Sequence, residues 1–172
     1  MHNMTIRQKL FAGFGLVLFM MVSLVVIGIQ NVNYIDETLT EISDVNSVKQ
    51  RYAINYRGSV HDRAIDIRDV VLATNNAEVQ VLVRHINTLE TFYHESEQAM
   101  KNMIDSGVIF TPEETSILTK IAAIQKKTTA QIQQIITLTQ QGDGSQAKSL
   151  LASEVAGNFK QWLKVINGFI DY

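Results

Sequence analysis

The side chains best suited to bind a charged molecule lie between Asn55 and Asp69, where the chain reads NYRGSVHDRAIDIRD. This stretch contains three arginines, three aspartates and one histidine. The planar guanidinium of arginine donates paired hydrogen bonds to a carboxylate, so arginines on one helix can hold an organic anion or pair with nearby acids. The sequence around each arginine indicates which of these two chemistries applies.

The three arginines differ in the acids that they can reach within their own helix. Side chains three and four positions apart face each other on a helix, so Arg63 can pair with Asp66. Arg57 and Arg68 have no acid at those spacings. They are eleven residues apart, which places them on one helix face with His61 close by. A guanidinium that lacks a counterion and is partly withdrawn from water is costly, so we expect an anionic partner for both.

Two sources of that negative charge are open: an acid on another helix or a bound anion. The candidate acids are Glu95, Glu97 and Glu154. The candidate ligand-binding residues are the cations and the tyrosine of this region: Arg57, His61, Arg63, Arg68, Arg84 and Tyr93. Arg84 is included because it also lacks an acid three or four residues away, and Tyr93 because its hydroxyl is available.

The sequence contains no motif that indicates an enzyme or a metal-binding site. It contains no glycine-rich phosphate loop, no G-x-S-x-G or H-E-x-x-H motif and no cysteine. His85 and His94 are nine residues apart and so lie on opposite faces of a helix. We therefore expect no enzyme, no bound metal and no cofactor. Fifteen basic against seventeen acidic residues give a formal charge of −2, which argues against a nucleic-acid partner.

A membrane-spanning helix is predicted for residues 10–29. These twenty residues contain no charge and no proline, and at about 1.5 Å per residue they cover the hydrocarbon core of a bilayer. Basic residues precede the segment, whereas the first charges after it are acidic. By the positive-inside rule, residues 1–9 form a cytoplasmic tip and residues 30–172 lie outside. A cleaved signal peptide is the alternative, but no small-residue cleavage site follows the segment.

The exported part reads as four helices, at about 31–74, 76–105, 112–141 and 145–172. Apolar residues recur three and four positions apart in each of them, which is the spacing of helices packed in a bundle. Short turns join the helices in sequence. The pattern therefore predicts an all-α fold, an up-down-up-down antiparallel four-helix bundle with an N-terminal transmembrane helix.

The first of these four helices has apolar residues on two sides. Its main series includes Ala53, Tyr56, Val60, Ile67 and Val70, with Asn46, Lys49 and Arg63 as polar interruptions. A second series lies to one side of the first: Ile54, Ala64, Ile65, Val71 and Leu72. A helix that is apolar on two sides has two neighbours. We expect one side to face the bundle and the other a second copy of the chain, in a homodimer.

Local signals mark where the later helices begin. Thr111, Pro112 and Glu114 form a capping box with a proline in the first turn. Gly142 to Gly144 form a turn, after which Ser145 is expected to cap the fourth helix. That helix reaches Tyr172 without a glycine cap or a basic last turn. We therefore expect the fourth helix to be truncated, with a second membrane helix beyond it in a longer protein.

These features together resemble the N-terminal part of a bacterial methyl-accepting chemotaxis protein. The stretch RGSVHDRAIDIRDVVL, from Arg57 to Leu72, is similar to the first helix of the four-helix-bundle sensors of that family. The resemblance implies a receptor in the inner membrane with a periplasmic sensor domain, dimeric through its first helices. It also implies a ligand near the membrane-distal end of the dimer interface. A cytoplasmic histidine kinase would respond indirectly, through a signalling domain that these 172 residues do not include.

The arginine spacing bears on the class of ligand. Arg63 and Arg68 follow Arg57 by six and eleven residues, and this spacing differs from that of the family's amino-acid receptors. The departure favours a small organic acid, a di- or tricarboxylate, over an amino acid. Two other functions fit the same architecture: the sensor domain of a histidine kinase and a membrane-tethered bundle that binds a protein partner.

Overall fold

The computed structural model describes residues 6–40 and 45–172, and they divide into two units at Asn46. In the first unit, α1 runs from Ile6 to Thr40. Its segment Leu10–Asp36 is long and apolar enough to cross a membrane by length and composition, and none of its most apolar part is buried. The predicted span at 10–29 lies within it, although the helix continues beyond residue 30 without a break.

The predicted helix at 31–74 is thereby divided between two elements. Its N-terminal residues, up to Thr40, belong to α1. Its C-terminal part forms α2, Ser47–Leu72. Residues 1–5 of the predicted cytoplasmic tip and residues 41–44 of the predicted helix lie outside the described residues. The next two helices are α3, Asn76–Asp105, and α4, Pro112–Gln140. Their bounds differ from the predicted ones by at most one residue.

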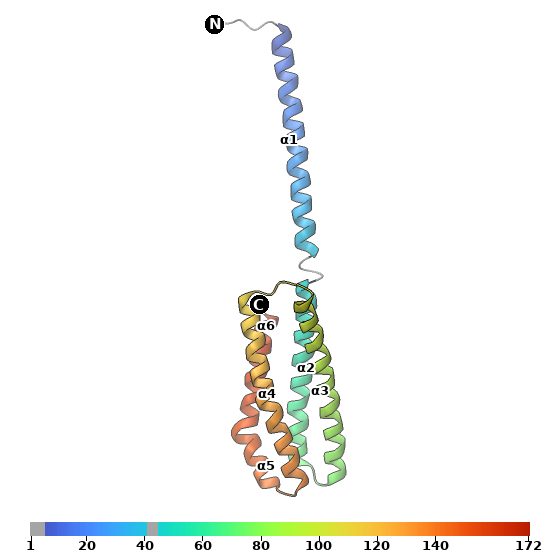
Figure 1. Cartoon of the computed structure of the whole chain (residues 1–172), viewed down its shortest axis with the longest axis vertical. Coiled ribbons are helices and arrows are strands. Elements are labelled where there is room, and N and C mark those ends of the chain that lie inside the picture. Colours follow the sequence, from blue (N-terminus) through green and yellow to red (C-terminus); the bar gives the residue numbers. More distant parts are fainter. Residues whose placement is uncertain (1–5, 41–44) are drawn as a thin grey trace. The chain divides into compact units, whose positions relative to one another are not determined.

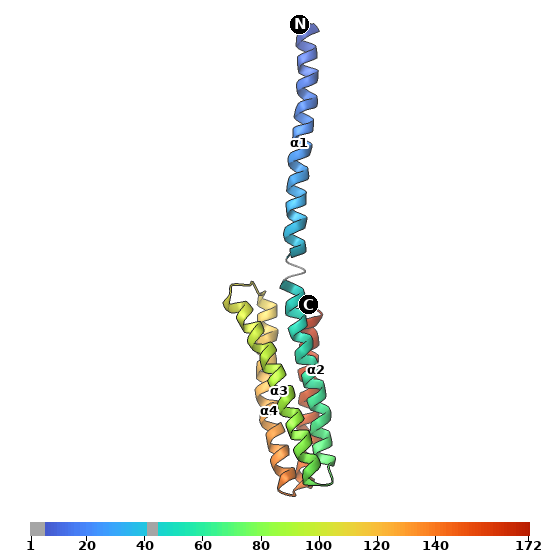
Figure 2. The same ribbon diagram turned by 90° about the vertical axis from the view of Figure 1, so that its right-hand side faces the viewer.

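The second unit is an all-helical antiparallel four-helix bundle, as predicted (Figures 1 and 2). The α2–α3 turn and the α4–α5 turn lie at one end of this bundle, and the loop between α3 and α4 lies at the other end with the last residue (Figure 1). Successive helices therefore run in alternating directions, which short connections favour.

The fourth helix of the bundle differs from its prediction. It consists of α5, Gly144–Leu150, a π-helical turn η2, Leu151–Val155, and α6, Ala156–Ile170. A π-helical turn accommodates one extra residue within a helix. The predicted cap Ser145 was wrong: the Asp143 side chain accepts from the backbone N–H of Gln146 and so caps the helix two residues earlier.

The bundle core follows the predicted alternation of three- and four-residue spacings, which together make a repeat of seven. In α3 the buried residues Val79, Ile86, Tyr93 and Met100 are spaced seven apart. In α2 one buried series is Lys49, Tyr56, Arg63 and Val70, and a second is Ala53, Val60 and Ile67. Of the three polar interruptions of the predicted seam, Lys49 and Arg63 are thus buried at core positions, whereas Asn46 is exposed. α6 contributes Phe159, Trp162, Ile166 and Phe169.

The predicted capping box of α4 is confirmed. The Thr111 hydroxyl accepts from the Glu114 backbone N–H at 3.1 Å, and a Glu114 carboxylate oxygen accepts from the Thr111 N–H at 2.7 Å. Two backbone donors that the first helical turn would leave unpaired are thereby satisfied. The box also holds Glu114 in place for a second interaction, described below.

Candidate functional site

The outer face of α2 carries two arginines and a histidine among uncovered apolar residues. Arg57, His61 and Arg68 are exposed there. Beside them, the residues Ile54, Ile65 and Leu72 are 51%, 38% and 64% exposed. The stripe repeats at spacings of three, four and seven, the pattern by which one helix packs on another. We call these six residues the α2 stripe.

The cations of the α2 stripe differ in their counterions. Arg68 Nη2 lies 3.0 Å from Asp69 Oδ1, and Arg68 Nε donates to the same oxygen at 3.1 Å. The prediction that Arg68 has no acid within its own helix was therefore wrong, because a long arginine side chain can fold back onto the adjacent residue. Arg57 forms no ion pair with any described residue. Arg57 is thus the stripe arginine without a described counterion.

Arg63 lies on the opposite side of α2, inside the bundle. It is 2% exposed, and its guanidinium carbon lies 5.1 Å from the ring centre of Tyr93 and 4.9 Å from that of Trp162. Its Nε donates to the Ser59 carbonyl at 3.4 Å, while its buried Nη2 has no partner among the described residues. Burial lowers the pKa of the Arg63 guanidinium, and Glu90 and Tyr93 oppose that shift. The two aromatic faces provide the electrostatic stabilisation that an acid would otherwise give.

The predicted pair of Arg63 with Asp66 does not form. Asp66 instead lies 2.7 Å from His85 Nδ1, which joins α2 to α3. Burial raises the pKa of the Asp66 carboxyl, and the hydrogen bond with His85 opposes that rise. The two residues diverge because Arg63 occupies a core position of the α2 repeat, whereas Asp66 lies on the side that faces α3.

Tyr93 connects the buried arginine to a second aromatic ring. Its ring stacks on Tyr56 at a centroid distance of 4.5 Å and meets Trp162 edge-on at 5.5 Å. The Tyr93 hydroxyl and the Trp162 Nε1 are both buried without a partner of hydrogen-bond geometry among the described residues. Burial raises the pKa of the Tyr93 phenol. Four side chains from three helices therefore form one aromatic and cationic cluster in the core.

Lys49 and Glu114 form a buried ion pair that the sequence did not reveal. Lys49 Nζ lies 3.0 Å from Glu114 Oε1, and the two side chains are 5% and 9% exposed. The ammonium also donates to the Ile109 carbonyl at 2.9 Å and lies 4.2 Å from the Phe110 ring centre. The pair fixes the loop between α3 and α4 to the start of α2. The only indication of this pair in the sequence was a lysine at a position of the repeat that is otherwise apolar.

The remaining predicted site residues lie apart from the α2 stripe. Arg84 is exposed on α3 and has no described ion pair. The candidate acid Glu97 accepts from His94 at 2.8 Å, and Glu154 accepts from Gln131 at 2.6 Å. Neither of these glutamates pairs with an arginine in the part of the chain that the structure describes. The structure thus groups Arg57, His61 and Arg68 together, and Arg63 with Tyr93.

Comparison with known protein families shows which family the chain belongs to. Residues 3–172 match the family described as a four helix bundle sensory module for signal transduction. The chain belongs to this family. The module is that of methyl-accepting chemotaxis proteins, so the resemblance carried by the Arg57–Leu72 stretch is confirmed. No curated protein matches the chain.

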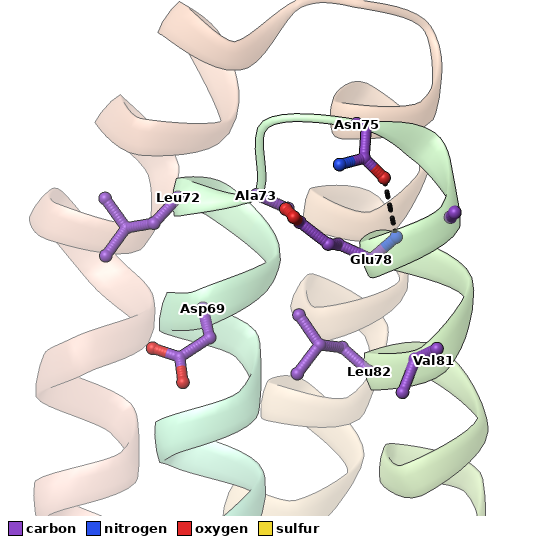
Figure 3. Close-up of a pocket in the computed structure, with 8 residues that line it drawn as sticks. Asp69, Leu72, Ala73, Asn75, Glu78, Val81 and Leu82 are labelled. Carbon is purple, nitrogen blue, oxygen red and sulfur yellow. Dashed lines mark hydrogen bonds between the residues drawn. The ribbon is translucent and has the colours of Figure 1, made fainter.

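This sensory module has a cavity of about 550 Å³ at the turn between α2 and α3. Figure 3 shows its lining, with Leu72 and Leu82 on facing helices and the carboxylates of Asp69 and Glu78 nearby. The Thr74 backbone N–H donates to Glu78 at 2.9 Å and lowers the pKa of that carboxyl. Both ionisable groups that line the cavity are acids. An organic anion is therefore better matched by the α2 stripe.

Among the described residues of the sensory module, no group of three or more histidine, cysteine or acidic side chains could hold a metal ion. The ionisable contacts of the bundle are pairs within or between helices.

Proposed function

We propose that this sensory module is the ligand-binding part of a chemoreceptor, and that it senses a small organic anion, a di- or tricarboxylate. The observation that carries the proposal is the α2 stripe, in which an arginine without a described counterion lies between uncovered isoleucines. A second copy of the chain packed on this stripe would cover the apolar residues. It would also bring the positively charged arginines of the two copies close together, and an anion bound between them would neutralise their repulsion.

The site is assigned to Arg57 and His61, with Arg68 in a supporting role. Arg57 and Arg68 are separated by about 16 Å along the helix, too far for one small dicarboxylate to reach both on a single helix. In a dimer with parallel helices, each arginine instead meets its own equivalent. Arg68 already has Asp69 as a counterion, whereas Arg57 has none that is described. An anion should therefore bind most favourably beside Arg57, where no other counterion competes with it.

The proposal places α1 in the inner membrane and the bundle in the periplasm. The apolar segment Leu10–Asp36 and the cation Arg7 before it support this orientation. A ligand that binds the dimer more tightly than the separate chains would shift a two-state equilibrium. That shift would reach a cytoplasmic histidine kinase through a signalling domain of a longer protein.

The test measures thermal unfolding of the full chain in lipid nanodiscs with succinate, malate or citrate. A ligand at a hundred times its dissociation constant should add about 2.7 kcal/mol to the free energy of unfolding. Arg57→Ala should abolish this gain, and Arg68→Ala should reduce it in part. Arg51→Ala, which removes an exposed arginine of α2 outside the stripe, should leave it unchanged.

Two results would overturn the proposal. One is a dimeric chain that no member of the carboxylate panel stabilises, which would favour a protein partner. The other is full stabilisation of the Arg57→Ala variant, which would place the ligand away from the α2 stripe.

A further inference from the structure

A second cavity opens to solvent between α3 and α4, away from the α2 stripe, and reaches buried side chains of the bundle. Its volume is about 140 Å³. Buried side chains of three helices form its inner wall: Tyr56, Tyr93, Met100 and Ile121. An enclosed apolar cavity of about this size can hold benzene, which sets the scale of the molecule that the volume admits. The volume therefore suits a molecule with a single ring.

The lining of this cavity favours an aromatic ring over an aliphatic one. The stacked rings of Tyr56 and Tyr93 present aromatic surface to it, and aromatic rings pair favourably edge-to-face or offset-stacked. Met100 adds a thioether, and sulfur makes favourable contacts with aromatic rings. The buried Tyr93 hydroxyl has no partner of full hydrogen-bond geometry, although the Trp162 side chain interacts with it. One polar group on the ring could provide that partner.

The rim of the cavity argues for a neutral molecule. Glu97 and Lys101 line it with one negative and one positive charge. The Glu97 carboxylate is already engaged by His94 at 2.8 Å and by Gln125 at 3.5 Å. Because the two rim charges balance, neither an organic anion nor a cation has the advantage there.

We propose that this cavity is a second ligand site of the module, which binds a neutral one-ring aromatic molecule with one small polar group. The site lies within a single bundle and does not depend on the anion site or on a dimer. Tyr93 forms part of its wall and contacts Trp162 on α6 at 5.5 Å. Occupancy is thereby transmitted from the cavity to the last helix of the bundle.

Trp162 provides the readout, because it is the only tryptophan of the chain and is fully buried. The full chain in nanodiscs is titrated with phenol, and Trp162 emission is excited at wavelengths that phenol does not absorb. We expect a saturable change in emission. Cyclohexanol, which has a similar size and the same hydroxyl without an aromatic ring, should act only at much higher concentration.

Two neighbouring alanines of α4 give a matched pair of variants. Ala122 lines the cavity and Ala123 does not, and both are exposed on the helix. Ala122→Leu should fill the cavity and raise the phenol concentration for half-saturation by about tenfold or more. Ala123→Leu should leave the titration unchanged. If Ala122→Leu does not fold, as judged by circular dichroism, Leu118→Phe narrows the same cavity from another wall position.

Three outcomes would overturn the proposal: no saturable change in the wild-type chain, an unchanged titration in the cavity-filling variant, or an equal response to cyclohexanol. Each leaves the anion proposal intact, because that proposal is tested on Arg57 with carboxylates. Conversely, a phenol response retained in Arg57→Ala would show that the two sites are separate.

Discussion

The guanidinium carbon of Arg63 lies 4.9 Å from the ring centre of Trp162, so a buried cation of α2 packs on the only tryptophan of the chain, in α6. Tyr93 of α3 lies 5.1 Å from the same carbon. Three helices of the bundle thus meet at one charge that forms no described ion pair, although Glu90 stabilises it electrostatically. Replacing Arg63 should therefore affect the stability of the bundle in a different way from replacing an exposed arginine.

Replacing Arg63 by a neutral side chain of similar length should not harm the bundle. Its Nη2 is buried without a partner, and an isolated buried charge is costly. We expect Arg63→Met to keep the free energy of unfolding or raise it by about 1 kcal/mol, since well-packed apolar replacements of buried charges are often stabilising. Urea unfolding followed by Trp162 fluorescence measures this. A loss of more than about 2 kcal/mol would mean that the stacking on the two rings outweighs desolvation.

Breaking the Lys49–Glu114 pair should have the opposite effect. Lys49→Met leaves the Glu114 carboxylate buried without its cation, and we expect a loss of about 3 kcal/mol in the free energy of unfolding. Combining it with Glu114→Gln removes the second charge and keeps the acceptor for the Thr111 N–H. The double variant should therefore be more stable than Lys49→Met alone. A double variant that is less stable would show that the remaining carboxylate is well solvated.

The Asp66–His85 contact makes a prediction about pH. Burial raises the pKa of Asp66 in the folded chain above its ordinary value of 3.8. A carboxyl whose folded pKa is raised favours folding at low pH, and that contribution is lost as the pH rises through the folded pKa. Relative to Asp66→Asn, the wild type should therefore lose stability as the pH rises above about 4.

Unfolding curves in urea at a series of pH values test this, with Asp105→Asn as the control because Asp105 is exposed on α3 and does not act on the pKa of Asp66. If the wild type instead gains stability relative to Asp66→Asn over that range, the hydrogen bond with His85 outweighs the effect of burial.

The two glycines that flank Asp143 should respond oppositely to alanine. Gly142 has φ +82°, a backbone conformation that alanine adopts at a cost of about 1 kcal/mol. Gly144 begins α5 without a positive φ, and a Cβ added there would meet no atom within 4 Å. Gly142→Ala should therefore lower the melting temperature, and Gly144→Ala should maintain or raise it. Calorimetry of both variants provides the comparison, and equal losses would contradict the assigned turn.

The α2 stripe predicts where a second copy packs. Ile54 is 51% exposed, so Ile54→Glu should leave the folded bundle intact while placing a carboxylate at the dimer contact. We expect dissociation to become easier by about tenfold or more, as measured by single-molecule counting in nanodiscs. Val81→Glu is the control, because Val81 is 57% exposed on α3 outside the stripe. An unchanged dimer in Ile54→Glu would place the interface elsewhere.

The sequence by itself determined the helices and the side of each that enters the core. The seven-residue repeat of Val79, Ile86, Tyr93 and Met100 is a local property, because the helical period alone places these residues on one face. The capping box at Thr111 and Glu114 is local in the same sense, since both partners lie within one turn. Predictions of these features were confirmed.

Only the tertiary structure decided how the charged residues are used. Arg63 and Arg57 belong to one helix and one stretch of sequence, yet the first is buried against Trp162 and the second is exposed. The ring partners of Arg63 lie up to a hundred residues away along the chain. Electrostatic interactions depend on distance and burial rather than on spacing in the sequence. For the same reason the pairing of Lys49 with Glu114 and of Asp66 with His85 appeared only when the helices were packed together.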